Sequence, residues 1–148
     1  MYNGKERKPT VTIEGLIRGV DYSVSYKDNV NVGIATVTIT GKGQYMGIVN
    51  KTFTIFRDIS KMEAELSYES CEYDGKEKKP DVKIEGLTEG KDYIVSYSNN
   101  INVGEAKVII TGKGNYTGTV TKSYVIYRKM STLKANLEYT DVEYDGKE

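Results

Sequence analysis

The 148-residue chain contains no histidine and no tryptophan, a single cysteine, two prolines and two phenylalanines. Without histidine it lacks the commonest general base and the commonest zinc ligand, which argues against an enzyme. One thiol excludes a disulfide within the chain, and we expect Cys71 to be a small half-buried apolar residue; a reactive thiol is the alternative. No apolar run approaches the about 20 residues that span a bilayer, and no signal peptide is visible.

Charge of either sign is not in excess, because 21 lysines and arginines balance 21 aspartates and glutamates. Nucleic-acid binding needs a concentrated basic face, so we expect no nucleic-acid partner. Tyrosine is abundant, with 13 residues. Its apolar ring with a polar tip suits thin, half-exposed sheets and contact surfaces.

An internal repeat is the strongest feature of the sequence. Tyr2, Tyr73 and Tyr144 open the motifs YNGKERKP, YDGKEKKP and YDGKE at a constant spacing of 71 residues, without insertion or deletion. We therefore interpret the chain as a window of a tandem array. Residues 1–57 form a first module that lacks its N-terminal strand, residues 58–129 a complete second module, and residues 130–148 the first strand of a truncated third.

Each module is predicted to consist of strands. In the second copy, one predicted inward face consists of Tyr93, Val95 and Tyr97, which alternate with Ile94, Ser96 and Ser98. The next consists of Ala106, Val108 and Ile110, which alternate with Lys107, Ile109 and Thr111, and this period of two is that of a half-buried strand. AELSYESCE, before Tyr73, reads as one alternating first strand, and GKGNYTG as a corner plugged by Tyr116. No segment has helical spacing. We expect an all-β fold of tandem small Ig-like β-sandwich modules of about 71 residues, or a β-grasp-like alternative, without significant helix.

The motifs also carry a resemblance. Both copies contain G-L-x-x-G-x-D-Y-x-V-S-Y, then G-x-A-x-V-x-I-T-G-K-G-x-Y-x-G. This pattern resembles the tandem Ig-like or MBG-type β repeats of cell-surface proteins from Gram-positive, clostridia-like bacteria. The resemblance implies a secreted module located at the cell surface or cell wall, used as a stalk or adhesive segment and not known as catalytic.

Acidic residues recur with the repeat, as Asp21 with Asp92 and Glu14 with Glu85. An enzyme rarely needs a duplicated site, so we interpret these carboxylates as turn caps and expect no catalytic residue. Calcium is the alternative, but no dense oxygen cluster of the D-x-D-x-D-G kind is present, and we expect no metal and no cofactor.

Two lysines, Lys51 and Lys122, share strand parity with apolar residues in V-x-K-x-(F/Y)-x-I. The simpler interpretation is a lysine at the rim of the core with its ammonium in water. The alternative is an isopeptide crosslink to an Asn or Asp, which would need a buried lysine.

The two unpaired ends form the last candidate site. The first module has no counterpart of the AELSYESCE strand, whereas the chain ends with a strand of its own, carrying Leu133, Ala135, Leu137, Tyr139, Val142 and Tyr144. Open sheet edges bind added strands. We expect this segment either to be disordered or to complete the first module of a neighbouring copy, which would build a filament.

Together these observations predict a non-enzymatic structural repeat of a bacterial extracellular surface protein: a stalk, fibre or adhesin that associates head to tail by strand complementation. The alternative is a module that binds a glycan or a host matrix protein, through faces such as Thr36/Thr38/Thr40 and Ser23/Ser25. Those residues are also ordinary exposed strand residues.

Overall fold

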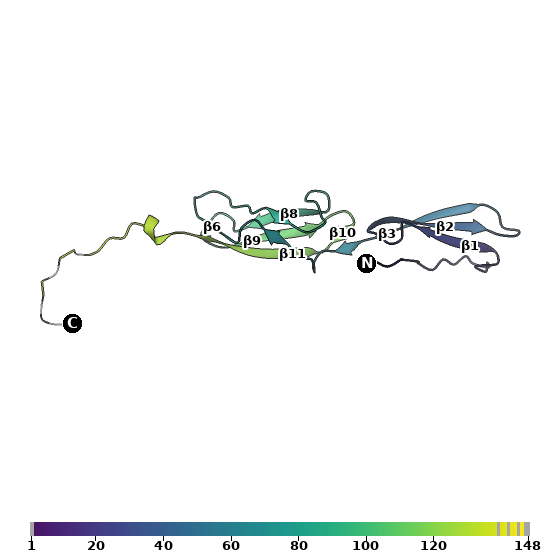
Figure 1. Ribbon diagram of the computed structural model, residues 1–148, viewed down its shortest axis with the longest axis horizontal. Coiled ribbons are helices and arrows are strands. Elements are labelled where there is room, and N and C mark those ends of the chain that lie inside the picture. Colours follow the sequence, from purple (N-terminus) through teal and green to yellow (C-terminus); the bar gives the residue numbers. More distant parts are fainter. Residues whose placement is uncertain (1, 139, 142, 145, 147–148) are drawn as a thin grey trace.

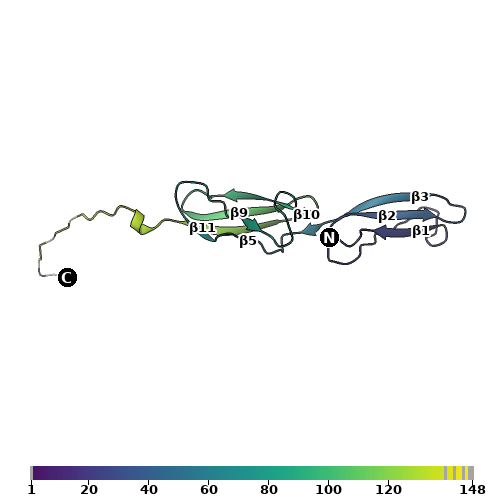
Figure 2. The ribbon, with the colours of Figure 1, turned by 45° about the horizontal axis from the view of Figure 1, so that its top comes forward.

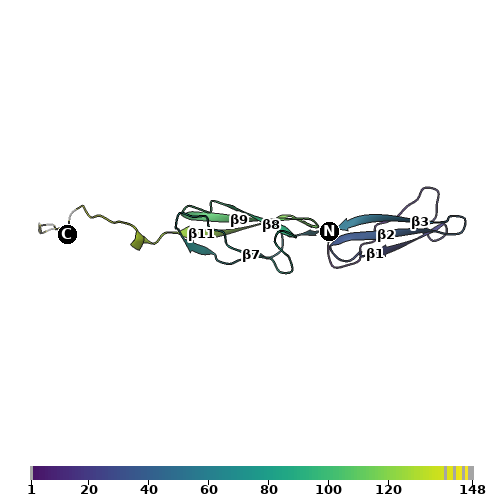
Figure 3. The same ribbon diagram turned by 90° about the horizontal axis from the view of Figure 1, so that it is seen from above.

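The computed structural model describes residues 2–138, 140–141, 143–144 and 146. It is all-β, as expected, and two modules lie end to end with a C-terminal tail extending from the second (Figure 1). Figure 2 and Figure 3 show the same linear order from two further directions. Within the described ranges the one helical element is a single 3₁₀ turn, η1 (Met130–Thr132). None of the described helices is long and apolar enough to cross a membrane.

The second module is built on a curled four-stranded sheet with the order β6-β11-β9-β8. β8 pairs antiparallel with β9, and β9 with β11, whereas β6 pairs parallel with β11. A two-stranded antiparallel sheet, β5–β7, packs on the same core through Leu66 and Val82. The strands are β5 (Glu65–Leu66), β6 (Ser70–Glu72), β7 (Val82–Lys83), β8 (Tyr93–Ser98), β9 (Gly104–Gly112), β10 (Tyr116–Thr117) and β11 (Thr119–Tyr127).

The alternation read from the sequence produces the core of this module. Ala106, Val108 and Ile110 are fully buried along β9, and Tyr93 is buried at the start of β8. Tyr116 packs at the end of the core, as the corner motif predicts. Gly112 is required there, because a Cβ would lie 2.8 Å from the backbone of Tyr116. The predicted inward faces of these strands are therefore confirmed.

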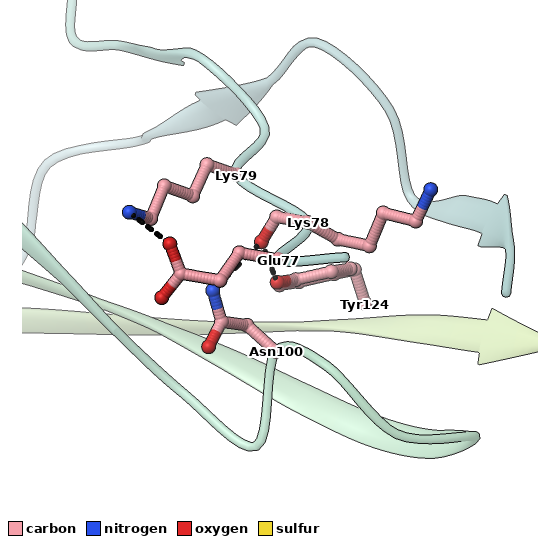
Figure 4. Close-up of polar contacts among 5 residues, drawn as sticks. All are labelled: Glu77, Lys78, Lys79, Asn100 and Tyr124. Carbon is pink, nitrogen blue, oxygen red and sulfur yellow. Dashed lines mark hydrogen bonds and ion pairs between the residues drawn. The ribbon is translucent and has the colours of Figure 1, made fainter. Parts of the chain in front are cut away.

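Polar contacts close the other end of this core (Figure 4). The hydroxyl of Tyr124 donates to the carbonyl of Lys78 at 2.6 Å, and the side-chain amide of Asn100 donates to the same carbonyl at 3.2 Å. Beside them, Lys79 pairs with Glu77 at 2.6 Å. The turn before Asn100 depends on Asn99, whose φ of 55° lies in the left-handed region that asparagine tolerates. These bonds hold the loop before Pro80 against the sheet.

One sequence prediction is wrong in detail. AELSYESCE is not one strand but two short ones, β5 and β6, which belong to different sheets. The chain crosses between them at Ser67–Glu69, where Ser67 exchanges hydrogen bonds with Asp81 and the Tyr68 ring packs edge-on against Tyr124. An alternating pattern cannot show this crossing, because both halves direct apolar side chains into the same core.

The first module repeats only part of this architecture. β1 (Tyr22–Lys27), β2 (Gly33–Gly41) and β3 (Ile48–Ile55) form an antiparallel sheet in the order β1-β2-β3, with the register of β8, β9 and β11. β3 is an edge strand here, whereas its counterpart β11 lies between β9 and β6. Val11 and Thr12, the counterparts of β7, are not in a strand. We attribute this to the absence of a β5 to pair with them.

Candidate functional site

The two modules are joined by a docked linker. β4 (Arg57–Asp58) follows β3 and pairs parallel with β10, which belongs to the corner of the second module. The backbone N–H of Arg57 donates to the carbonyl of Asn115 at 3.0 Å, and that of Ile59 to the carbonyl of Thr117 at 2.8 Å. The predicted domain boundary between residues 57 and 58 thus falls inside a strand that belongs to the junction.

Side chains reinforce this junction. Ile59 has no exposed surface and is part of the core of the second module. The Asp58 carboxylate accepts a hydrogen bond from the backbone N–H of Ser60 at 2.8 Å. This hydrogen bond is the largest cause that lowers the pKa of Asp58 below its usual value. A hydrogen bond from the Ser60 side chain is the second cause. The junction therefore combines backbone pairing, a buried apolar anchor and a capped turn.

Ile59 was not among the predicted site residues. A usable signal was present: an isolated apolar residue, Ile59 in one copy and Met130 in the next, recurs at the repeat spacing inside an otherwise polar linker. The absence of proline and glycine from residues 57–61 indicates a stiff linker, but it does not show where the linker docks.

The first module has an open groove on the face that residues 59–72 cover in the second module. It has a volume of about 490 Å³ and is lined by residues including Val11, Ile13, Ile39, Val49 and Lys51. A second hollow, of about 280 Å³, shares Ile13, Ile39 and Val49 and extends to the corner residues Tyr45 and Met46. We refer to these two hollows together as the open groove.

The uncovered state of the open groove is visible residue by residue. Val49 is 52% exposed, whereas its repeat counterpart Val120 is 9% exposed. Ile13 is 36% exposed, whereas its counterpart Ile84 is 1% exposed. The same apolar residues are thus buried in one module and exposed in the other, and the difference is the covering segment.

The described residues of the C-terminal segment predicted to act as an added strand lie away from both modules (Figure 1). Among its described residues, Leu133, Leu137 and Tyr144 are exposed, Ala135 is exposed as well, and no strand is formed. Tyr139 and Val142, which belong to the same prediction, lie outside the described residues. The structure therefore does not bring the predicted segment together with the predicted edge within one chain.

The two candidate isopeptide lysines are not enclosed by the core. The side chain of Lys122 is 38% exposed, and its Nζ lies 3.7 Å from a carboxylate oxygen of Glu63. Lys51 is exposed. An isopeptide crosslink would need a buried lysine, so the exposure of both favours lysines at the rim of the core with their ammonium groups in water. The crosslink remains a prediction, which intact mass measurement can test.

Of the four carboxylates predicted to cap turns, Asp21 and Asp92 form capping hydrogen bonds. Asp21 accepts from the backbone N–H of Ile17 at 2.7 Å, and Asp92 from that of Thr88 at 2.9 Å, so both carboxylates cap turns as predicted. Cys71 is a free, partly buried thiol packed against the core. Within the part of the chain that the structure describes, no three Cys, Asp or Glu side chains gather as a metal site would require, and Glu14 and Glu85 are exposed.

The hydroxyl-bearing strand faces are partly engaged within the sheet. Thr38 bonds to the Asn50 side chain at 2.9 Å, and the Ser23 hydroxyl lies 3.5 Å from the carbonyl of Thr40. Ser25 is exposed, while Thr36 and Thr40 are half-buried. These hydrogen bonds of Thr38 and Ser23 are thus made within the sheet.

Comparison with protein-family models, with curated proteins and with solved structures finds no match for this chain.

Proposed function

We propose that this chain is a non-enzymatic structural repeat of an extracellular surface protein, serving as a stiff spacer in a stalk, fibre or adhesin. The observation that carries the proposal is the junction: β4 pairs with β10, and Ile59 from the linker is buried in the next module. A linker that is part of the following domain's core fixes the angle between the two domains. Modules joined in this way transmit position along a fibre, which a free linker does not.

The sequence resemblance supports the cellular setting of the proposal, the surface or wall of a Gram-positive, clostridia-like bacterium. We also propose that each complete module is a reduced Ig-like sandwich. The β5–β7 pair covers one face of the curled sheet through Leu66 and Val82, as the second layer of a sandwich does. A β-grasp module would place a helix on that face, and in the described part of this module the face carries strands.

Distances between labels on the two modules test the spacer role. In a Cys71→Val background, cysteines replace the exposed Ser25 in the first module and Lys107 in the second, and both carry spin labels. Valine is the residue that the repeat itself places at position 142. We expect one narrow distance distribution, and a broad one when Gly-Ser-Gly is inserted between Phe56 and Arg57. Equal widths in the two proteins would contradict the proposal.

The surface location has a test of its own. On intact cells that produce the parent protein, antibodies raised against this chain should bind without permeabilisation. Binding only after lysis would contradict an extracellular role. A glycan array probed with the same chain tests the alternative, a glycan- or matrix-binding module, which specific retention would favour.

A further inference from the structure

The second module shows what occupies the open groove of the first, because the two are copies. There, residues 59–72 lie over the counterparts of the groove residues: Ile59 and Ala64 are buried, and Met62 and Leu66 pack against the same core. At the repeat spacing, these four positions correspond to Met130, Leu133, Ala135 and Leu137 of the tail. The tail therefore carries apolar or small residues at every position that covers the second module.

The tail, from Met130 onward, already has the local conformation that residues 59–62 have on the second module. In the second module, the backbone N–H of Met62 donates to the carbonyl of Ile59 at 2.8 Å. In η1, the N–H of Leu133 donates to the carbonyl of Met130 at 3.0 Å, which is the same bond one repeat later. Met130 and Leu137 are each 78% exposed in the free tail, against none for Ile59. The turn is formed and its apolar side chains are uncovered.

The tail cannot reach the open groove of its own chain in this register. Met130 would have to dock at the Tyr45–Met46 corner, which precedes β3 and lies at the end of the first module away from the second (Figure 1). Met130 follows the end of β11 by three residues, a reach of about 10 Å. β11 alone has nine residues and spans about 30 Å. The occupant must therefore come from a second molecule.

We propose that residues 130–138 of one copy bind the open groove of a second copy, in the register that residues 59–67 occupy on the second module. The inference deepens the proposed structural function, because the same contact would join consecutive repeats in a longer array. Since donor and acceptor lie at opposite ends of the chain, the contact is heterologous and repeats in one direction, giving a linear filament.

The Glu63–Lys122 ion pair of the template is not reproduced in this contact. Glu63, which lies near Lys122, corresponds to Lys134, and Lys122 corresponds to Lys51. The docked tail thus brings Lys134 toward the exposed Lys51. Exposed charge pairs contribute little, so this weakens the contact without preventing it. Lys134→Glu restores the template pair and should tighten association a few-fold, with the gain decreasing at high salt.

The association is tested with the full-length chain by analytical ultracentrifugation. We expect concentration-dependent linear oligomers. Leu137→Asp disables the donor and Val49→Asp the acceptor; both positions are exposed in the free chain, so folding should persist, which circular dichroism checks. Each variant alone should remain monomeric, and an equimolar mixture should form a dimer and nothing larger. Ile34→Asp, at an exposed position that does not line the groove, is the matched control and should oligomerise like the unmodified chain.

A disulfide trap tests the register. Glu65 faces Lys83 in the antiparallel β5–β7 pair, and these positions correspond to Asn136 and Thr12. In the Cys71→Val background, Asn136→Cys combined with Thr12→Cys should give intermolecular disulfides under mild oxidation. Asn136→Cys combined with Glu14→Cys should give few, because a residue two positions along the strand lies beyond disulfide reach.

A chain that stays monomeric at millimolar concentration would overturn the proposal, as would a mixture of the Leu137→Asp and Val49→Asp variants that does not dimerise. Equal crosslinking of the two cysteine pairs would overturn the register. The label-distance experiment measures the junction within one chain, and these experiments measure contact between chains. Failure of one is therefore distinguishable from failure of the other.

Discussion

Gly118 lies directly against the carboxylate of Asp58, so that a Cβ at position 118 would collide with Asp58 Oδ1. Gly118 belongs to the corner of the second module and Asp58 to the linker that leaves the first. A side chain at position 118 would displace Asp58, the residue of β4 that pairs with Thr117 of β10. The glycine of the corner motif thus has a role at the junction in addition to its φ of 86°.

Gly118→Ala should destabilise the junction, whereas Gly47→Ala should not. Both glycines have positive φ, so each alanine costs about 1–2 kcal/mol of backbone strain. No atom lies within 4 Å of a Cβ at Gly47, so that variant measures strain alone. Gly118→Ala additionally displaces Asp58 and should broaden the distance distribution between labels on the two modules. Indistinguishable distributions for the two variants would show that the contact does not hold the linker.

Ile59→Ala should destabilise the second module by about 2–5 kcal/mol, because it leaves a cavity in a fully buried position. Met130→Ala, the same position one repeat later, should change stability by less than about 0.5 kcal/mol in the monomer, because Met130 is exposed. Urea unfolding followed by two-dimensional NMR resolves the amide signals of each module. An equal effect of both substitutions would contradict the assignment of Ile59 to the core.

The second module should lose stability in alkali. Burial raises the pKa of Tyr124 to about 12, from an ordinary value of 10.0. Below about pH 10 the phenol is neutral in both the folded and unfolded chains. Above it the unfolded chain ionises first, so the free energy of unfolding falls by about 2 kcal/mol by about pH 12. Burial also raises the pKa of Tyr93 and Tyr97, which adds to the loss in the same direction.

Tyr124→Phe isolates the contribution of this phenol. At neutral pH it should cost about 1 kcal/mol, the hydrogen bond to the carbonyl of Lys78. In alkali it should flatten the fall in the free energy of unfolding, measured by urea titration between pH 9 and about 12. Tyr127→Phe, on the same strand but 39% exposed, is the matched control for loss of a hydroxyl and should change stability at neutral pH by less than about 0.5 kcal/mol. A profile that is as steep in Tyr124→Phe as in the unmodified chain would contradict the assignment.

Intact mass spectrometry should give the unmodified mass of the chain. Lys122 lies beside the exposed Glu63 and Lys51 is exposed, so neither is activated by burial. A crosslink to asparagine would expel ammonia and one to aspartate would expel water. A mass lower by either amount, absent in Lys122→Arg or Lys51→Arg, would restore the isopeptide hypothesis.

The sequence by itself determined the repeat, its strands and their buried faces. Period-two alternation places Ala106, Val108 and Ile110 on one side of a strand whatever that strand pairs with, and the constant spacing transfers the assignment to the first copy. The turn caps Asp21 and Asp92 could be predicted for the same reason, since each acts on a backbone group four residues away.

Only the tertiary structure decided where the strands divide and what the linker does. The split of AELSYESCE into β5 and β6 depends on which partner strand each half meets, and the burial of Ile59 depends on a corner far along the chain. These are pairings between segments distant in sequence, and local periodicity contains no information about them. The open groove also depends on tertiary contacts. The apolar face of the first module is exposed because no segment packs on it as residues 59–72 pack on the second module.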